Sequence, residues 1–139
     1  MINVTQVRAD LGDILEPADP VPGAAPAWNV YPSGLDDRAA FPAVIIGMPR
    51  WAPGPTGCID LTEWPVAVVV EMAGGDSSFG AVIGDLDGLW PDVLATLTEA
   101  FKTDRRFGRA AHVVRAEFST YPVQGRAFPA QLIFVSIDG

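Results

Sequence analysis

Four consecutive apolar residues, Ala43–Ile46, constrain the fold of this 139-residue chain more than any other feature. They form the middle of a predicted strand over Phe41–Met48. A strand with one face in water alternates apolar and polar residues. Because this segment does not alternate, we expect protein to cover both of its faces. A second apolar segment, Trp64–Met72, contains three consecutive valines at residues 68–70 and predicts another strand.

A long amphipathic helix is predicted over Ala81–Lys102. Its apolar residues recur every three or four positions, as they do on the buried side of a helix: Leu86, Leu89, Trp90, Val93, Leu94, Leu97 and Phe101. Pro91 falls inside this pattern and leaves two alternatives. Either Asp87 caps a helix whose first turn contains Pro91, or an earlier helix kinks at the proline.

The N-terminal segment predicts a shorter helix, Val4–Glu16, with its apolar residues at helical spacing. Asn3 and Gln6 have the spacing of a capping box, in which each side chain bonds to the backbone N–H of the other residue. Pro17 ends the helix. Gly12 weakens the helix by about 1 kcal/mol relative to alanine.

The C-terminal part of the chain predicts a β-hairpin. Apolar residues at even positions alternate with polar ones from Val114 to Ser119, which indicates a strand with one buried and one wet face. Pro122–Gly125 is the predicted turn, and Leu132–Val135 is the apolar core of the returning strand. Pro129 has no N–H to donate, so we expect it at an edge or a bulge of the sheet.

A short strand at Ala27–Tyr31 and a proline-rich loop at Pro49–Glu63 complete the pattern. The predicted order is α-β-β-β-α-β-β, in which helices and strands do not alternate as βαβ units. We therefore expect a single α+β domain over residues 1–139. Its sheet would be mostly antiparallel, with helices packed against it.

The chain carries 17 acidic and 9 basic residues, a formal net charge of -8. A negative field repels phosphate, which disfavours specific binding to nucleic acid. The charge serves either solubility or a surface that DNA passes without adhering. No apolar run approaches the roughly 18–20 residues of a membrane span. A lone cysteine, Cys58, and the lack of a secretory signal in Met1–Arg8 predict synthesis in a cytoplasm.

Residues that carry chemistry are sparse. The only histidine, His112, is predicted to be an ordinary polar residue at a strand start, and the only cysteine has no base adjacent to it in the sequence. Gly75–Gly80 does not match the G-x-S-x-G pattern of hydrolases, because Phe79 occupies the place of the second glycine. Asp85 and Asp87 supply too few oxygens for a hard cation. We expect no catalytic, cofactor-binding or metal-binding residue.

Several residues are candidates for protein contacts instead. The only basic cluster, at residues 105–109, either docks an acidic partner or matches the negative end of the preceding helix. Trp28, Trp51 and Trp64 lie in or beside predicted loops, where each either anchors an interface or closes the edge of the core. The candidate interface residues are Trp28, Asp36, Asp37, Arg38, Trp51, Cys58, Asp60, Glu63, Asp76, Arg105 and Arg106.

In the order of its elements, the chain resembles the tail terminator (tail-completion) proteins of long-tailed bacteriophages. The resemblance covers almost the whole length. It includes the N-terminal helix, a strand that begins Phe41-Pro-Ala-Val44 after an acidic turn, and a second strand that begins near Trp64. A helix containing Trp90-Pro91 and the C-terminal hairpin complete it. The resemblance implies a non-enzymatic ring, typically a hexamer, that caps the tail tube, stops its polymerisation and joins the tail to the head.

The implied partners are further copies of the chain, the major tail tube protein and the head-connector or stopper protein. DNA passes through the central hole without specific binding, no membrane is involved, and the ring lies in the virion at the head–tail junction. The resemblance places neighbour contacts in Pro32–Ala40, Pro49–Glu63 and Gly74–Gly80. Two alternatives remain: another neck component such as a stopper or adaptor, and a small α+β enzyme or ligand-binding domain.

Overall fold

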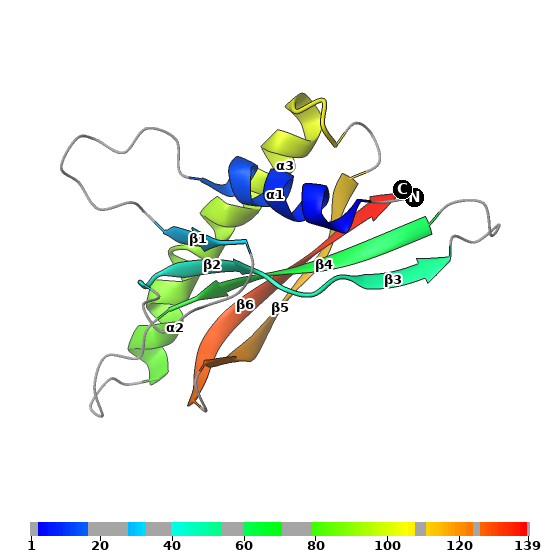
Figure 1. Ribbon diagram of the computed structural model, residues 1–139. Helices are drawn as coiled ribbons and strands as arrows, with labels where there is room; N and C mark the ends of the chain where they lie inside the picture. The colour runs from blue at the N-terminus through cyan, green and yellow to red at the C-terminus, as the bar shows by residue number, and fades with distance from the viewer. Residues whose placement is uncertain are drawn as a thin grey trace.

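The computed structural model shows a six-stranded sheet with helices packed against it, an α+β architecture (Figure 1). The structure describes residues 3–16, 28–32, 40–53, 60–70, 79–107, 111–123 and 126–138. The elements in chain order are α1 (Val4–Leu15), β1 (Asn29–Tyr31), β2 (Ala43–Ile46), β3 (Arg50–Pro53), β4 (Asp60–Val69), α2 (Phe79–Asp87), α3 (Trp90–Thr103), β5 (Ala111–Val123) and β6 (Arg126–Asp138). The predicted fold class and element order are confirmed, with one added strand and one divided helix.

The strand order across the sheet is β1-β2-β4-β6-β5, and β3 pairs with β4 on the same side as β2. All neighbours are antiparallel except β1 and β2, so the prediction of a mostly antiparallel sheet is confirmed. Pairing between β4 and β6 ends at Val69 and Ala130. Pro129 lies just past this point and is paired with β5 only. On the side that β4 no longer reaches, its missing N–H breaks no hydrogen bond between strands.

Strand β2 is buried on both faces, as its continuous apolar sequence predicts. None of its four residues is more than 1% exposed. Val44 and Ile46 pack into the cluster that contains the buried side chains of all three helices, and the other two residues belong to a second cluster. Because neighbouring residues of a strand point to opposite faces, the second cluster lies on the face away from the helices. There the rings of Phe41 and Phe128 stack with their centroids 5.3 Å apart.

The predicted long helix is divided into α2 and α3. Pro91 lies in the first turn of α3, where its missing N–H has no partner to lose. The cap of that helix is Leu89, without a side-chain hydrogen bond, so the prediction that Asp87 caps it is wrong. The Asp87 carboxylate instead accepts a hydrogen bond from Nε1 of Trp90 at 3.3 Å. The apolar stripe still packs on the sheet, since it continues from α2 into α3.

Residues 50–53, predicted as part of a loop, form β3 beside the first residues of β4. The register along this edge shifts by one residue between β2 and β3. At the break, the N–H of Gly47 donates to the carbonyl of Pro65 at 2.8 Å, and Pro65 has no N–H to return. The prediction of a loop over Pro49–Glu63 is therefore wrong at both ends. Residues 50–53 form β3, and β4 begins at Asp60, before the expected start at Trp64.

The C-terminal hairpin is longer than predicted. Pro122 and Val123 pair with Ala127 and Arg126, so the turn is tighter than Pro122–Gly125. The hairpin extends past the end of β4, away from α1 and the start of β3 (Figure 1). Part of β5 and β6 therefore lies beyond the region where β6 pairs with β4.

The expected buried face of the first hairpin strand is wrong in part. Ala116 packs against the helix-covered core, but Val114 is 45% and Phe118 47% exposed. A register shift between Val113 and Arg115 places Val114 in a bulge. Strand β5 is also the last of the sheet, so the helices do not cover all of its inner face.

Helix α1 is held at both ends. The Asn3 carboxamide accepts a hydrogen bond from the N–H of Gln6 at 3.1 Å. The Gln6 side chain donates to Asp10 at 2.8 Å instead of returning to Asn3, so only one half of the predicted capping box forms. At the other end, Nε1 of Trp28 donates to the carbonyl of Leu15 at 2.7 Å. None of the helices in the described residues is long and apolar enough to cross a membrane.

Candidate protein-protein interface

Two of the three candidate tryptophans belong to the core. Trp28 is 7% exposed and closes the end of α1, and Trp64 is fully buried in β4. The guanidinium of Arg8 lies 5.3 Å from the centre of the Trp64 ring. The indole N–H of Trp64 has no hydrogen-bond partner among the described residues. Neither ring presents a surface for a partner, so the interface interpretation of Trp28 and Trp64 is corrected: both side chains are buried in the core.

Five of the candidate interface residues lie outside the described residues: Asp36, Asp37, Arg38, Cys58 and Asp76. Asp60 is the first residue of β4, and its side chain is also outside the described part. The predicted contact segments Pro32–Ala40, Pro49–Glu63 and Gly74–Gly80 fall partly or wholly outside it. The contact roles of these residues stay predictions.

Arg106 is held within the chain. Its guanidinium lies 2.6 Å from carboxylate oxygens of both Asp104 and Asp13, and 3.6 Å from Asp10. Hydrogen bonds from Arg106 lower the pKa of Asp104 to about 2, and the same bonds raise the pKa of Arg106. These pairs tie α1 to the turn after α3, so Arg106 acts in the packing of a helix end. Arg105 beside it is exposed.

The third candidate tryptophan, Trp51, is exposed on β3. Its side chain is 64% exposed, and that of Met48, just before the strand, is 78% exposed. Thr62, opposite Trp51 in β4, is buried. We name these two exposed residues, Trp51 in β3 and Met48 just before it, the first apolar patch. Of the two alternatives for Trp51, the exposed side chain is compatible with an interface anchor, and that role stays a prediction.

A second apolar patch lies on β5 and consists of Val114 and Phe118. Sequence reasoning missed it, because the alternation of this strand indicates which residues share a face but not where the helices end or where a bulge lies. Met48 was missed as well, since it ends an apolar segment that predicts burial. The register shift beside Met48 depends on pairing with β4, which no local pattern reports.

The two patches lie on opposite edges of the sheet. Strand β3 flanks β4 on one side, while β6 and then β5 follow on the other. Between them, on the face away from the helices, Glu63 accepts from Arg115 at 3.1 Å. The Arg115 guanidinium also lies 4.0 Å from the centre of the Phe134 ring. Glu63, a candidate interface residue, is thus paired within the chain.

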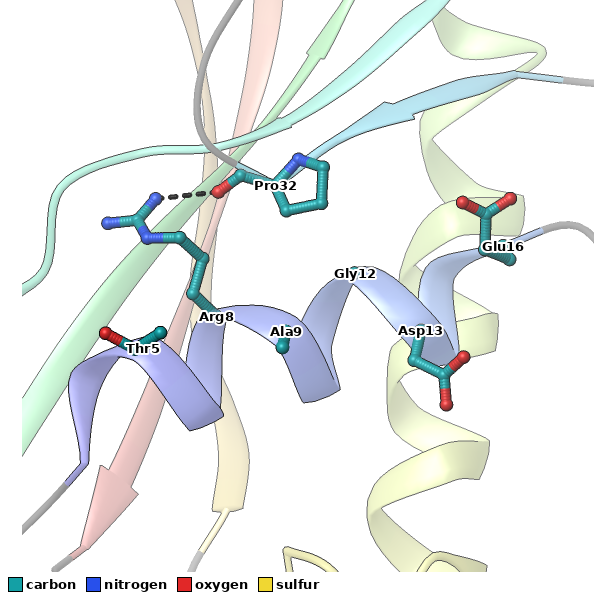
Figure 2. A pocket seen from close by; sticks show the side chains of 7 residues that line it. All are labelled: Thr5, Arg8, Ala9, Gly12, Asp13, Glu16 and Pro32. Carbon is teal, nitrogen blue, oxygen red and sulfur yellow. Dashed lines mark hydrogen bonds between the residues drawn. The ribbon is translucent and has the colours of Figure 1, made fainter.

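A hollow of about 410 Å³ separates α1 from the end of β1 (Figure 2). Arg8 points from α1 toward Pro32 and donates to the carbonyls of Pro32 and Ile46, at 2.8 and 3.0 Å. Asp13 in the same helix and Glu16 at its C-terminal cap supply negative charge. Because the Arg8 guanidinium already donates to backbone carbonyls of this chain, we interpret the hollow as the place where α1 meets the sheet and not as a ligand site.

Groups that carry chemistry are not brought together in the described residues. No three His, Cys, Asp or Glu side chains cluster there as metal ligands would. His112 is exposed opposite Ser136 near the start of β5, as predicted for a polar residue at a strand start. Asp85 and Asp87 are both exposed on α2.

No protein-family model matches the chain, and a search of the curated proteins finds no match. The resemblance to tail terminators therefore stays a prediction.

Proposed function

We propose that this protein is a structural subunit of a ring at the head–tail junction of a long-tailed bacteriophage, where it terminates the tail tube. The observation that carries the proposal is the pair of apolar patches on opposite edges of one sheet: Met48 with Trp51, and Val114 with Phe118. Exposed apolar groups at sheet edges mark places where protein is expected to bind.

The placement of the patches favours a ring over a two-fold dimer. A two-fold dimer uses one self-complementary surface, so a single patch is enough for it. Two different surfaces on opposite sides of a subunit lead to head-to-tail association, which closes into a ring when the rotation between neighbours allows it. The formal net charge of -8 suits the same function, because a negative surface does not retain DNA that moves past it.

The proposed termination activity is testable on growing tail tubes. Purified protein is added to the polymerising major tail protein of the same phage, and tube lengths are measured by negative-stain electron microscopy. We expect shorter tubes with extra density at one end. Unchanged lengths and bare ends would contradict termination.

A ring that binds the head connector but leaves tube growth unchanged would instead identify a stopper or adaptor. Genomic position gives an independent check. A gene between those for the head connector and the major tail protein supports the proposed position in the virion.

A further inference from the structure

We infer, on the basis of the ring proposed above, that neighbouring copies join by pairing β3 of one copy with β5 of the next. The two strands run antiparallel across the contact, with Arg50 of one copy opposite Glu117 of the other. Trp51 then lies against Ala116 and diagonally beside Phe118. The occupant of each edge is thus a second copy of this chain.

Both edges are open in the part of the chain that the structure describes. Strand β3 pairs only with β4 there, and β5 pairs only with β6. An unpaired edge presents a row of N–H and C=O groups that another strand can bind. Pro49, just before β3, and Pro53, its last residue, have no N–H to donate to a neighbouring strand. The contact is therefore short, and it fits within the 13 residues of β5.

Strand directions fix the sense of the pairing. β3 runs antiparallel to β4, β4 to β6, and β6 to β5, so β3 and β5 run in opposite directions within one copy. A rotation about an axis parallel to the strands keeps each strand direction. In a ring built on such an axis, β5 of one copy meets β3 of the next in the antiparallel sense.

The apolar residues fall on the matching face. Trp51 is opposite Thr62, two residues from Trp64 on the face that the helices cover. Ala116 packs into the same helix-covered cluster, and Phe118 follows it by two residues. The small Ala116 side chain leaves room for the exposed indole, and diagonal neighbours across an antiparallel pair are within reach of aromatic rings.

The charges fall on the other face. Arg50 is exposed, and no ion pair joins it to another described residue. Its cross-strand neighbour Glu63 already binds Arg115. Glu117 is 54% exposed and reaches Nε of Arg115 only at 4.0 Å. Opposite charges placed directly across a strand pair stabilise it, whereas like charges destabilise it.

A charge exchange tests this contact. Arg50→Glu and Glu117→Arg are made singly and together, and the oligomer is measured by mass photometry over a dilution series. Each single variant places like charges across every contact, so we expect its association to weaken by at least about tenfold. The double variant restores opposite charges and should assemble as the unchanged protein does. Asp85→Arg is the matched control for Glu117→Arg, since it makes the same charge change at an exposed site on helix α2, outside both strands, and it should leave the oligomer intact.

The outcomes separate the contact from the ring. An unchanged chain that stays monomeric contradicts both. A ring that survives the single variants, or a double variant that fails to restore it, overturns the edge contact alone. Loss of assembly in Glu117→Arg but not in Arg50→Glu points to pairing between two β5 strands and also overturns it. Circular dichroism verifies that each variant folds. If a charge variant misfolds, Trp51→Ser provides a second test, because loss of the indole should dissociate the ring.

Discussion

Two glycines let backbone segments approach proline rings in this fold. A Cβ at Gly12 would lie 2.8 Å from Cγ of Pro32, and one at Gly47 would lie 2.8 Å from Cγ of Pro65. These separations are too short for a methyl group, and a proline ring cannot swing away as the end of a flexible side chain can. Gly12, costly for an isolated helix, is thus required by the packing of α1 on β1.

Gly12→Ala should therefore destabilise the protein, although alanine favours helices. Overpacking costs about 1–3 kcal/mol, more than the roughly 1 kcal/mol gained in helix propensity. We expect a net loss of about 1 kcal/mol in the free energy of unfolding, measured by urea denaturation.

Gly84→Ala is the matched control for this prediction. A Cβ at Gly84 in α2 meets no atom within 4 Å, so the propensity gain stands alone and stability should rise by about 0.5–1 kcal/mol. Stabilisation by both alanines would show that Pro32 does not pack on Gly12 as described.

The ion pair between Arg106 and Asp104 makes the free energy of unfolding depend on pH in the acidic range. The pKa of Asp104 is lowered to about 2 from its ordinary 3.8 by hydrogen bonds from Arg106. A carboxyl group whose pKa is lowered by folding stabilises the protein above its ordinary pKa, and this contribution is lost as the pH falls through the lower value. Asp104→Asn should thus lower the free energy of unfolding at pH 5, and the difference from the unchanged protein should shrink toward pH 2.

Asp85→Asn removes a charge from an exposed position of α2 and serves as the control for the acid series. It should change stability by less than about 0.5 kcal/mol at pH 5. A deficit in Asp104→Asn that stays constant from pH 5 to pH 2 would contradict the assigned role of its charge.

At the scale of elements, α3 is anchored by the buried side of its apolar stripe. Leu97 is fully buried, whereas Leu94 is only half-buried on the same helix. Leu97→Ala should cost about 2–5 kcal/mol of unfolding free energy, and Leu94→Ala less than half as much. Thermal and urea denaturation of the two variants measure this difference. Equal losses would mean that the helix packs in another rotation.

The elements that sequence predicts well are those whose patterns are local. Ala43–Ile46 has no polar residue to face water, so burial on both faces follows directly. The stripe of α3 likewise follows from spacing alone. β3 and the bulge at Val114 could not be predicted in this way, because both depend on the register of strands that are distant in the sequence.

The same limit applies to the interaction surface. Trp28, Trp51 and Trp64 look alike in sequence, as aromatic residues beside proline-rich segments. Only the fold shows that Trp28 bonds to the end of α1 and that Trp64 lies beneath Arg8, while Trp51 stays exposed on an edge. The alternation around Phe118 predicts a buried side chain, because alternation reports which face a residue is on and not whether a helix covers that face.

At the scale of the whole molecule, the proposed assembly depends on one sheet with two different edges that carry exposed apolar residues. In the proposed ring, head-to-tail association pairs β3 and β5 of every copy, which protects these two strands from open-ended aggregation. The charges stay outside the apolar contact: Glu63 and Arg115 pair with each other on the face away from the helices, and Arg106 is held by α1.

The proposed head-to-tail association is tested by the mass of the purified protein in solution, measured by size-exclusion chromatography with light scattering over a wide range of concentrations. Association through two different edges predicts one discrete oligomer of several subunits, whose mass does not grow further as the concentration rises. A monomer at all concentrations, or a dimer that grows no further, would contradict it.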